Sequence, residues 1–172
     1  MGEVGALSSP ELLADHHDIE IFSSGEASLD NWLRRRARAN QVSGATRTYV
    51  ACEGKGVIGY YALASGAITV ESAPGRFRRN MPKSIPVAIL ARLAVDRHWQ
   101  GKGIGRALFR DAALRVAQAA DVIGIRGIVV HAISEEAKKF YVALGFEPSP
   151  REPMMLMVTL SDILAAARTK KK

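Results

Sequence analysis

The sequence predicts a single mixed α+β domain, a twisted β-sheet with helices on both faces. Its length of 172 residues suits one domain. Short apolar runs of strand type alternate with segments of helical period, and no repeat or linker divides the chain. We therefore expect residues 1–172 to form one domain, with residues 1–45 as an N-terminal extension that contains a helix and residues 161–172 as a frayed tail.

Composition excludes several classes of protein. With 48% hydrophobic and 24% charged residues, the chain is not disordered throughout, collagen-like or a disulfide scaffold. The single cysteine, Cys52, has no partner for an intramolecular bridge, which suits a reducing compartment. The N-terminal segment lacks the pattern of a signal peptide, and no apolar run is long enough to span a bilayer. We expect a cytoplasmic protein with no membrane partner.

The first half of the chain predicts a helix and a β-hairpin. Ser24-Gly25-Glu26 introduces the helix. Residues at helical spacing along it are Leu29, Trp32, Leu33, Ala37 and Asn40. Residues Thr46–Glu53 alternate like a strand, and a glycine turn at 54–56 leads to a second strand, Val57–Val70. Residues Glu71–Ile85 contain prolines and basic residues, which predicts a loop or a short irregular helix.

The second half predicts two buried strands, each followed by a helix. Pro86–Val95 is a nearly continuous apolar run, typical of a strand that is buried on both faces. A helix follows the glycines at 101–105, with an apolar stripe of Ile104, Leu108, Ala112, Val116 and Ala120. Ile123–Ala132 predicts the next strand, and Ser134 is a suitable N-cap for the next helix. Met154–Leu160 closes the sheet.

The positive charge is concentrated in the middle of the chain. The formal net charge is +7, and the segment from Arg76 to Arg115 holds ten Lys or Arg and two acids. The remainder carries a net charge of −1. This distribution indicates a polyanionic ligand, either nucleic acid or a phosphorylated cofactor. A solvated basic face is the alternative.

Residues 95–106, VDRHWQGKGIGR, contain the strongest local motif. They lead from a buried strand through a glycine-rich turn into an amphipathic helix. Such a turn is an anion cradle, because the backbone can approach closely and the first N–H groups of the helix have no intrahelical acceptor. Arg97, Lys102 and Arg106 add full positive charges around it.

Two common phosphate-binding motifs do not fit this turn. A Walker A loop needs Ser or Thr after its lysine, whereas Gly103 follows Lys102. The dinucleotide-binding fingerprint needs a third glycine where Arg106 stands. The pattern that remains is Gln100-x-x-Gly103-x-Gly105.

The Gln100-x-x-Gly103-x-Gly105 pattern follows a predicted strand, and a strand–helix unit that contains Phe140-Tyr141 comes after it. In this arrangement, residues 46–160 resemble the GNAT superfamily of acetyl-CoA-dependent N-acetyltransferases. The resemblance implies that residues Gln100 to Arg106 bind the pyrophosphate of coenzyme A. It implies that the strand residues Leu93-Ala94-Val95 lie along the pantetheine arm, and that Tyr141 lies beside the thiolate. The implied cofactor-binding residues are Leu93, Ala94, Val95, Arg97, Gln100, Gly101, Lys102, Gly103, Ile104, Gly105, Arg106, Ser134 and Phe140. No metal is expected.

A narrower resemblance covers nearly the whole chain. The stretches FSSGEASLDNWL, RTYVA, GYYALASGAI, RRNMPKSIPVAILARLAVD and EEAKKFYVALGF are similar to the GNAT toxins of bacterial toxin–antitoxin modules, of the TacT type. This resemblance implies acetylation of the amino group of aminoacyl-tRNA and inhibition of translation. It also implies a ribbon–helix–helix antitoxin that binds operator DNA, and a homodimer. Alternatives are acetylation of a small-molecule or protein amine, and a nucleic-acid-binding module without enzymatic activity.

The chemistry of acetyl transfer defines what Tyr141 can do. A phenol of pKa about 10 is a poor proton donor to a thiolate near 8.5, since the transfer is uphill by about 2 kcal/mol. We expect Tyr141 to donate a hydrogen bond to the thiolate, although packing on an amphipathic helix is the alternative.

No motif places a general base, for which the candidates are Glu71, Glu135, Glu136, His98 and His131. An α-amine needs none, because its pKa of about 7.7–8.0 leaves roughly a third of it neutral at pH 7.5.

Basic residues outside the loop are candidates for contacts to tRNA phosphates. They are Arg76, Arg78, Arg79, Lys83 and Arg92, with a basic surface loop as the alternative. The cluster Arg34–Arg38 either meets an antitoxin or is solvated. We expect His16-His17 to be a surface pair without metal-ligand spacing to a partner, Cys52 to belong to the core, and His131 to be structural.

Overall fold

The computed structural model describes residues 7–170, and the side chains of residues 7–166. The chain forms two compact units. One comprises Met1–Ala64 and Ala91–Ala112, and the other comprises Ser65–Leu90 and Ala113–Lys172. Residues 1–6 and 171–172 lie outside the described residues. The expectation of no signal peptide depends partly on the first of these segments, and the second ends the expected tail.

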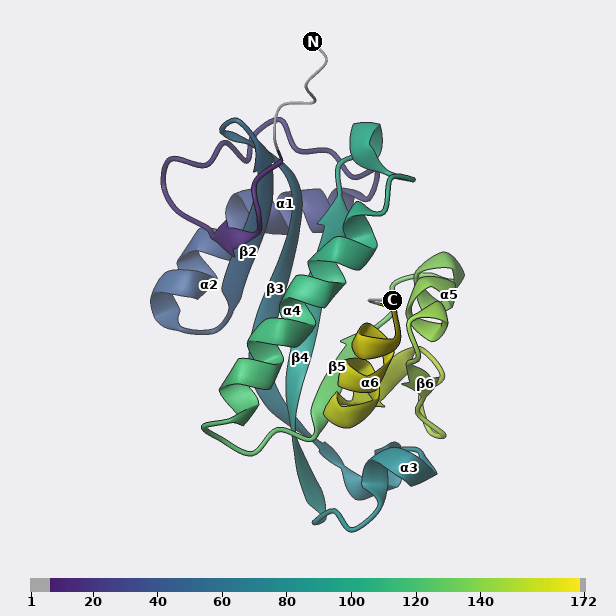
Figure 1. The fold of residues 1–172 in the computed structure, drawn as a ribbon. Coiled ribbons are helices and arrows are strands. Elements are labelled where there is room, and N and C mark those ends of the chain that lie inside the picture. The colour runs from purple at the N-terminus through teal and green to yellow at the C-terminus, as the bar shows by residue number, and fades with distance from the viewer. Residues whose placement is uncertain (1–6, 171–172) are drawn as a thin grey trace. The chain divides into compact units, whose positions relative to one another are not determined.

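The strands form one mixed sheet of seven strands in the order β1-β2-β3-β4-β5-β7-β6 (Figure 1). The pair β4–β5 is parallel, whereas β1–β2, β2–β3, β5–β7 and β6–β7 are antiparallel. The strands are β1 Glu11–Leu12, β2 Arg47–Glu53, β3 Gly56–Thr69, β4 Ser84–Val95, β5 Gly127–His131, β6 Glu147–Pro148 and β7 Met155–Thr159. The helices are α1 Ala27–Arg35, α2 Ala37–Ser43, α3 Gly75–Arg78, α4 Ile104–Ala120, α5 Glu135–Ala143 and α6 Leu160–Lys170. Short 3-10 turns, η1 Val70–Ser72 and η2 Arg97–Trp99, complete the chain. The predicted α+β fold is confirmed.

In the first unit, two helices replace the single helix that the sequence predicts. The helical stripe does bury Leu29, Leu33 and Ala37. However, the backbone leaves the helix at Arg36, with φ −120° and ψ −31°, and α2 then packs against β2 (Figure 1). The kink fits both short helices to one core, in which the hydroxyl of the fully buried Tyr60 donates a 2.7 Å hydrogen bond to the Leu29 carbonyl.

The predicted hairpin is confirmed as β2 and β3. Its turn requires a left-handed residue, and Gly54 has φ +64°. Cys52 lies on β2 with 2% of its surface exposed, and burial raises the pKa of its thiol to about 11. The expectation that Cys52 is a core residue is therefore confirmed, since a buried, protonated thiol is a poor nucleophile.

In the second unit, β5 begins at Gly127, later than the predicted start at Ile123. Ile123 is 58% exposed and lies in the connection that follows α4. The core packs Phe77 of α3 onto the sheet residues Ile85, Val87, Val129, Met155 and Met157. Ser134 caps α5 as predicted, because its hydroxyl accepts a 3.1 Å hydrogen bond from the N–H of Ala137.

The expectation of a frayed tail is wrong for residues 161–170, which continue α6. The Thr159 hydroxyl accepts a hydrogen bond from the N–H of Asp162 at 3.1 Å and so caps this helix. Ile163, one turn along, is buried. The cap and the buried apolar residue stabilise this helix, although the basic composition of the tail suggested that it would fray. Within the described part of the chain, no helix has the length and apolarity of a membrane span.

Candidate active site

The glycine-rich loop between β4 and α4 is anchored at its start by Asp96. This residue is 9% exposed, and its carboxylate accepts hydrogen bonds from the N–H groups of Ser23, at 3.1 Å, and His98, at 3.0 Å. Its own N–H donates to the Ile58 carbonyl at 2.8 Å. These bonds tie the loop to β3 and to the segment before α1, so the loop begins from a fixed point.

The side chain of Gln100 holds the loop against its own strand. Its Nε2 donates to the carbonyls of Val95 and Ser24, both at 2.8 Å. Both hydrogens of the amide are therefore donated to carbonyls of the chain itself. The exposed glutamine of the motif fixes the shape of the loop, and ligand contacts are left to the backbone that follows.

The glycines of the loop adopt conformations that other residues resist. Gly101 and Gly103 have φ of +78° and +85°, in the left-handed region. A Cβ placed on either would meet no heavy atom within 4 Å, so both face open space. Among residues 7–170, no carbonyl outside α4 accepts a hydrogen bond from the backbone N–H groups of 101–106. Free amides around an open cradle at a helix N-terminus fit a diphosphate.

Positive charge surrounds the cradle. A guanidinium nitrogen of Arg97 donates to the Ser23 hydroxyl at 3.1 Å, and the ammonium of Lys102 lies 5.9 Å from the centre of the Trp99 ring. Arg106, in the first turn of α4, is exposed. The helix dipole adds to these three charges, so the loop attracts an anion.

Tyr141, on α5 in the second unit, is 8% exposed. Its ring makes edge contacts with Phe140 and Phe146, at 5.1 Å and 5.3 Å between ring centres. Burial raises the pKa of Tyr141 well above its usual value of about 10. Among the described residues, its hydroxyl has no hydrogen-bond partner. The group is therefore a protonated phenol that is free to donate one hydrogen bond.

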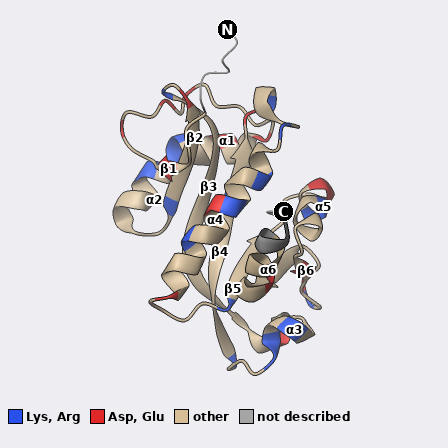
Figure 2. Cartoon of the chain, viewed as in Figure 1, with Lys and Arg blue, Asp and Glu red and all other residues tan. Residues whose placement is uncertain are grey.

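The basic residues predicted to contact RNA fall into two groups. The second unit holds four on or after α3, and Figure 2 shows the positive charge on this helix. All four, Arg76, Arg78, Arg79 and Lys83, are exposed, and Arg76 forms a 2.8 Å ion pair with Asp162. Arg92 belongs to the first unit, where its guanidinium carbon lies 5.1 Å from the centre of the Trp32 ring.

Two arginines of the Arg34–Arg38 cluster stabilise the first unit. Arg34 donates to the Phe22 carbonyl at 3.0 Å. Arg38 donates to the carbonyls of Ala14, at 3.1 Å, and His17, at 2.8 Å. These two side chains fasten the segment before α1, while Arg35 and Arg36 are exposed. The cluster as a whole is therefore neither simply solvated nor wholly free for a partner.

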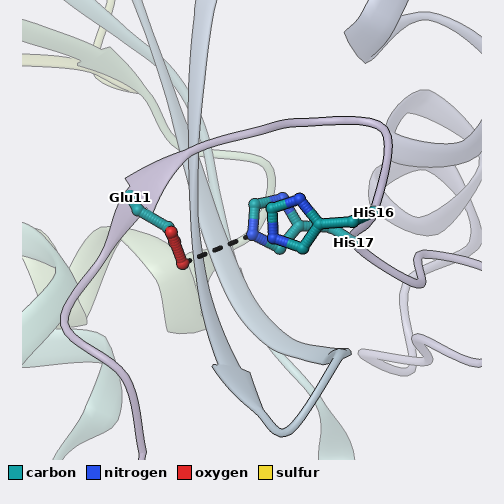
Figure 3. A group of neighbouring side chains, drawn as sticks. All are labelled: Glu11, His16 and His17. Carbon is teal, nitrogen blue, oxygen red and sulfur yellow. Dashed lines mark ion pairs between the residues drawn. The ribbon is translucent and has the colours of Figure 1, made fainter.

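His16 and His17 differ from the expected surface pair, because His17 is only 4% exposed. Figure 3 shows both rings beside Glu11, whose carboxylate oxygen lies 3.4 Å from Nε2 of His17. The ligand atoms of the three residues lie within 4.8 Å of one another, a spacing that could suit a metal. However, Nδ1 of His17 accepts a 2.8 Å hydrogen bond from the Ala14 N–H, so the neutral ring carries its proton on Nε2. The atom facing Glu11 then has no lone pair for a metal, and the contact is structural.

The anchoring role of Asp96 and its partner Ser23, which lie 73 positions apart, was not predicted from the sequence. A local signal for Asp96 existed, because an aspartate directly before a short helical turn is a common cap. No local signal pointed to Ser23, since its contact depends on how the segment before α1 folds back.

Three comparisons place the chain among known proteins. The family profile "Acetyltransferase (GNAT) domain" matches residues 44–148. A "tRNA-acetylating toxin" of Mycobacterium tuberculosis is 52% identical over 158 residues, which cover 92% of this chain and 95% of that protein. The solved structure of AtaT complexed with acetyl-methionyl-tRNAfMet has a TM-score of 0.86 at 30% identity and covers 94% of this chain and 99% of its own.

A further solved structure contains a Tyr→Phe mutant of AtaT bound to acetyl-CoA and to the C-terminus of the antitoxin AtaR. It has a TM-score of 0.80 at 30% identity and covers 94% of this chain and 97% of its own. The residues matched by the profile, 44–148, include the glycine-rich loop described above. The chain belongs to the GNAT family of acetyltransferases.

Proposed function

We propose that this protein transfers the acetyl group of acetyl-CoA to the amino group of aminoacyl-tRNA and so inhibits translation. The observation that carries the proposal is the open loop from Gln100 to Arg106, with its free amides and three cationic side chains. Support for the acceptor comes from the relative named for tRNA acetylation and from the similar toxin solved with an acetylated aminoacyl-tRNA.

In this proposal, the backbone of residues 101–106 binds the diphosphate of coenzyme A, and Arg97, Lys102 and Arg106 balance its charge. Residues 93–95 of β4 lie along the pantetheine arm. Ser134 and Phe140, at the start and in the middle of α5, complete the cofactor-binding residues. The free loop amides support the first of these roles, and the resemblance to the family implies the others.

Acetyl transfer then needs little from side chains. The neutral α-amine attacks the thioester carbonyl, a C–N bond forms, and the C–S bond breaks. Tyr141 donates its hydrogen bond to the departing thiolate, and the proton lost by the amine neutralises that thiolate. A general base is dispensable, because an α-amine of pKa about 7.7–8.0 is partly neutral near pH 7.5.

We further propose that a ribbon–helix–helix antitoxin neutralises the enzyme and links it to operator DNA, and that the protein is a cytoplasmic homodimer. The similar toxin that was solved with the C-terminus of its antitoxin supports an antitoxin partner. Size-exclusion chromatography with light scattering tests the dimer.

Incubation with labelled acetyl-CoA tests the proposed reaction. We expect label on charged tRNA, released with the amino acid after mild alkaline hydrolysis, and none on deacylated tRNA. Free amino acids at the same concentration should accept far less label, because they lack the phosphates that the basic segment binds. Equal labelling of free amino acids, or label only on protein, would contradict the acceptor assigned here.

Replacing Arg78 and Arg79 together by alanine should weaken tRNA binding and reduce its salt dependence. Each lost phosphate contact lowers the slope of log K against log salt by about 0.7–0.9, so the double variant should lose up to about 1.8. A matched control replaces the exposed Lys55 and Arg151, which removes the same charge elsewhere. The measurement is the affinity for tRNA at salt concentrations from about 50 to 300 mM, a range over which affinity that depends on phosphate contacts falls steeply. An unchanged slope would remove these arginines from the RNA contact.

A further inference from the structure

We infer that Arg126 is a positioning residue that holds α3 in the conformation in which Arg78 and Arg79 bind RNA phosphates, without contacting RNA itself. This inference rests on the proposed function, in which the segment around α3 contacts the tRNA backbone. All the residues involved belong to the second unit.

The side chain of Arg126 is a clamp on α3. Its Nε donates to the carbonyl of Phe77 at 2.8 Å, and one of its terminal nitrogens donates to the carbonyl of Arg76 at 2.9 Å. Its guanidinium carbon also lies 5.9 Å from the centre of the Phe77 ring. A helix as short as Gly75–Arg78 is not stable alone in water, because the entropy lost in ordering its backbone exceeds the stabilisation from the hydrogen bonds of a single turn. Tertiary contacts such as these must hold it.

The clamp is itself fixed to the sheet. The N–H of Arg126 donates to the Pro86 carbonyl at 2.8 Å, and its carbonyl accepts from the Leu160 N–H at 3.1 Å. Beside it, Gly127 leaves room for the ring of Phe77, which a Cβ at position 127 would strike. Phe77 is 1% exposed and anchors α3 in the core. Arg126 and Phe77 therefore connect α3 to two strands and to α6.

Different arginines hold α3 in place and face the solvent where RNA would bind. Arg126 is half-buried and points two nitrogens at carbonyls, and Arg76 is paired with Asp162. Arg78 and Arg79 are exposed, and among the described residues neither has an ion-pair partner. A held helix presents these two charges without the entropy cost of ordering the segment when RNA binds.

The experiment measures tRNA affinity against salt for Arg126→Gln and Arg126→Lys. We expect both variants to bind at least about 5-fold more weakly at every salt concentration, from the ordering cost of two side chains, with the slope unchanged. Lysine keeps the charge, but its single nitrogen cannot occupy the positions of both Nε and the terminal nitrogen of the rigid guanidinium, so it should not restore affinity. The KM for charged tRNA should rise by the same factor, while kcat and acetyl-CoA affinity stay unchanged. Arg151→Gln, at an exposed site, is the charge control.

Other outcomes distinguish the possible errors. A slope reduced by about 0.7–0.9 in Arg126→Gln, restored by Arg126→Lys, would show that Arg126 contacts a phosphate directly and would overturn the inference. Unchanged affinity in Arg126→Lys would overturn it as well, and this variant decides if the glutamine variant does not fold. If Arg78→Ala with Arg79→Ala leaves the slope unchanged, the RNA contact itself fails, whatever the Arg126 variants do.

Discussion

Replacing Tyr141 by phenylalanine is expected to lower kcat by about 10²–10⁴, the usual contribution of a group that handles the charge of a leaving atom. The phenol is held by aromatic neighbours on α5, and its hydroxyl has no partner among the described residues. Phenylalanine preserves those ring contacts and leaves no buried group unpaired. The free energy of unfolding should therefore change by less than about 1 kcal/mol. Single-turnover acetylation of charged tRNA and a thermal melt measure the two effects.

The pH dependence of the same reaction gives a second readout. Tyr141 acts as a protonated donor, and burial raises the pKa of Tyr141 above its usual value, so it stays protonated through pH 10. The rate should rise with pH as the α-amine loses its proton, with a midpoint of about 7.7–8.0, and should not fall again below pH 10. A descending limb between pH 8 and 10 in rates corrected for alkaline hydrolysis of the aminoacyl ester, or activity of the phenylalanine variant close to that of the parent, would remove Tyr141 from the mechanism.

Replacing Gly103 by alanine is expected to weaken acetyl-CoA binding by about 10-fold or more. Gly103 has φ +85°, where a Cβ costs about 1–2 kcal/mol. The loop must either bear that strain or turn its amides away from the diphosphate. The new methyl group would also project into the open space of the cradle. Isothermal titration calorimetry with acetyl-CoA measures the loss.

Gly54 provides the matched control for this substitution. It also has a positive φ, +64°, and open space at its Cβ, but it lies in the β2–β3 turn. Gly54→Ala should reduce the free energy of unfolding by a similar amount and leave the acetyl-CoA affinity intact. Equal losses of affinity in both variants would mean that the effect at position 103 comes from general destabilisation.

The fold was predictable where a periodic pattern spans a whole element. The hairpin, the apolar run that became β4 and the stripe of α4 all have such patterns, and the structure confirms them. The break at Arg36 and the continuation of α6 past residue 160 were not predictable. Both depend on tertiary packing, in one case of two short helices on the same core and in the other of Ile163.

The candidate site divides in the same way. The glycines that carry the loop are a local motif, so the anion cradle was predictable from the sequence. The contacts that fix it, from Asp96 to Ser23 and from Gln100 to Ser24, join segments more than 70 positions apart. His17 was misjudged because its burial depends on how the segment before α1 folds back, where Arg38, 21 positions away, donates to the His17 carbonyl at 2.8 Å. Long-range partners of polar side chains leave no periodic trace in a sequence.

The most direct test of the account compares acetyl-CoA with acetyl-pantetheine, which lacks the diphosphate and nucleotide, by calorimetry on the parent protein. We predict saturable binding of acetyl-CoA to one site per chain, and affinity for acetyl-pantetheine at least about 100-fold weaker, because a diphosphate on free helix amides and three cations provides several kcal/mol. Failure to bind acetyl-CoA, or equal affinity for the two compounds, would contradict the assignment of the Gln100–Arg106 loop as the diphosphate site.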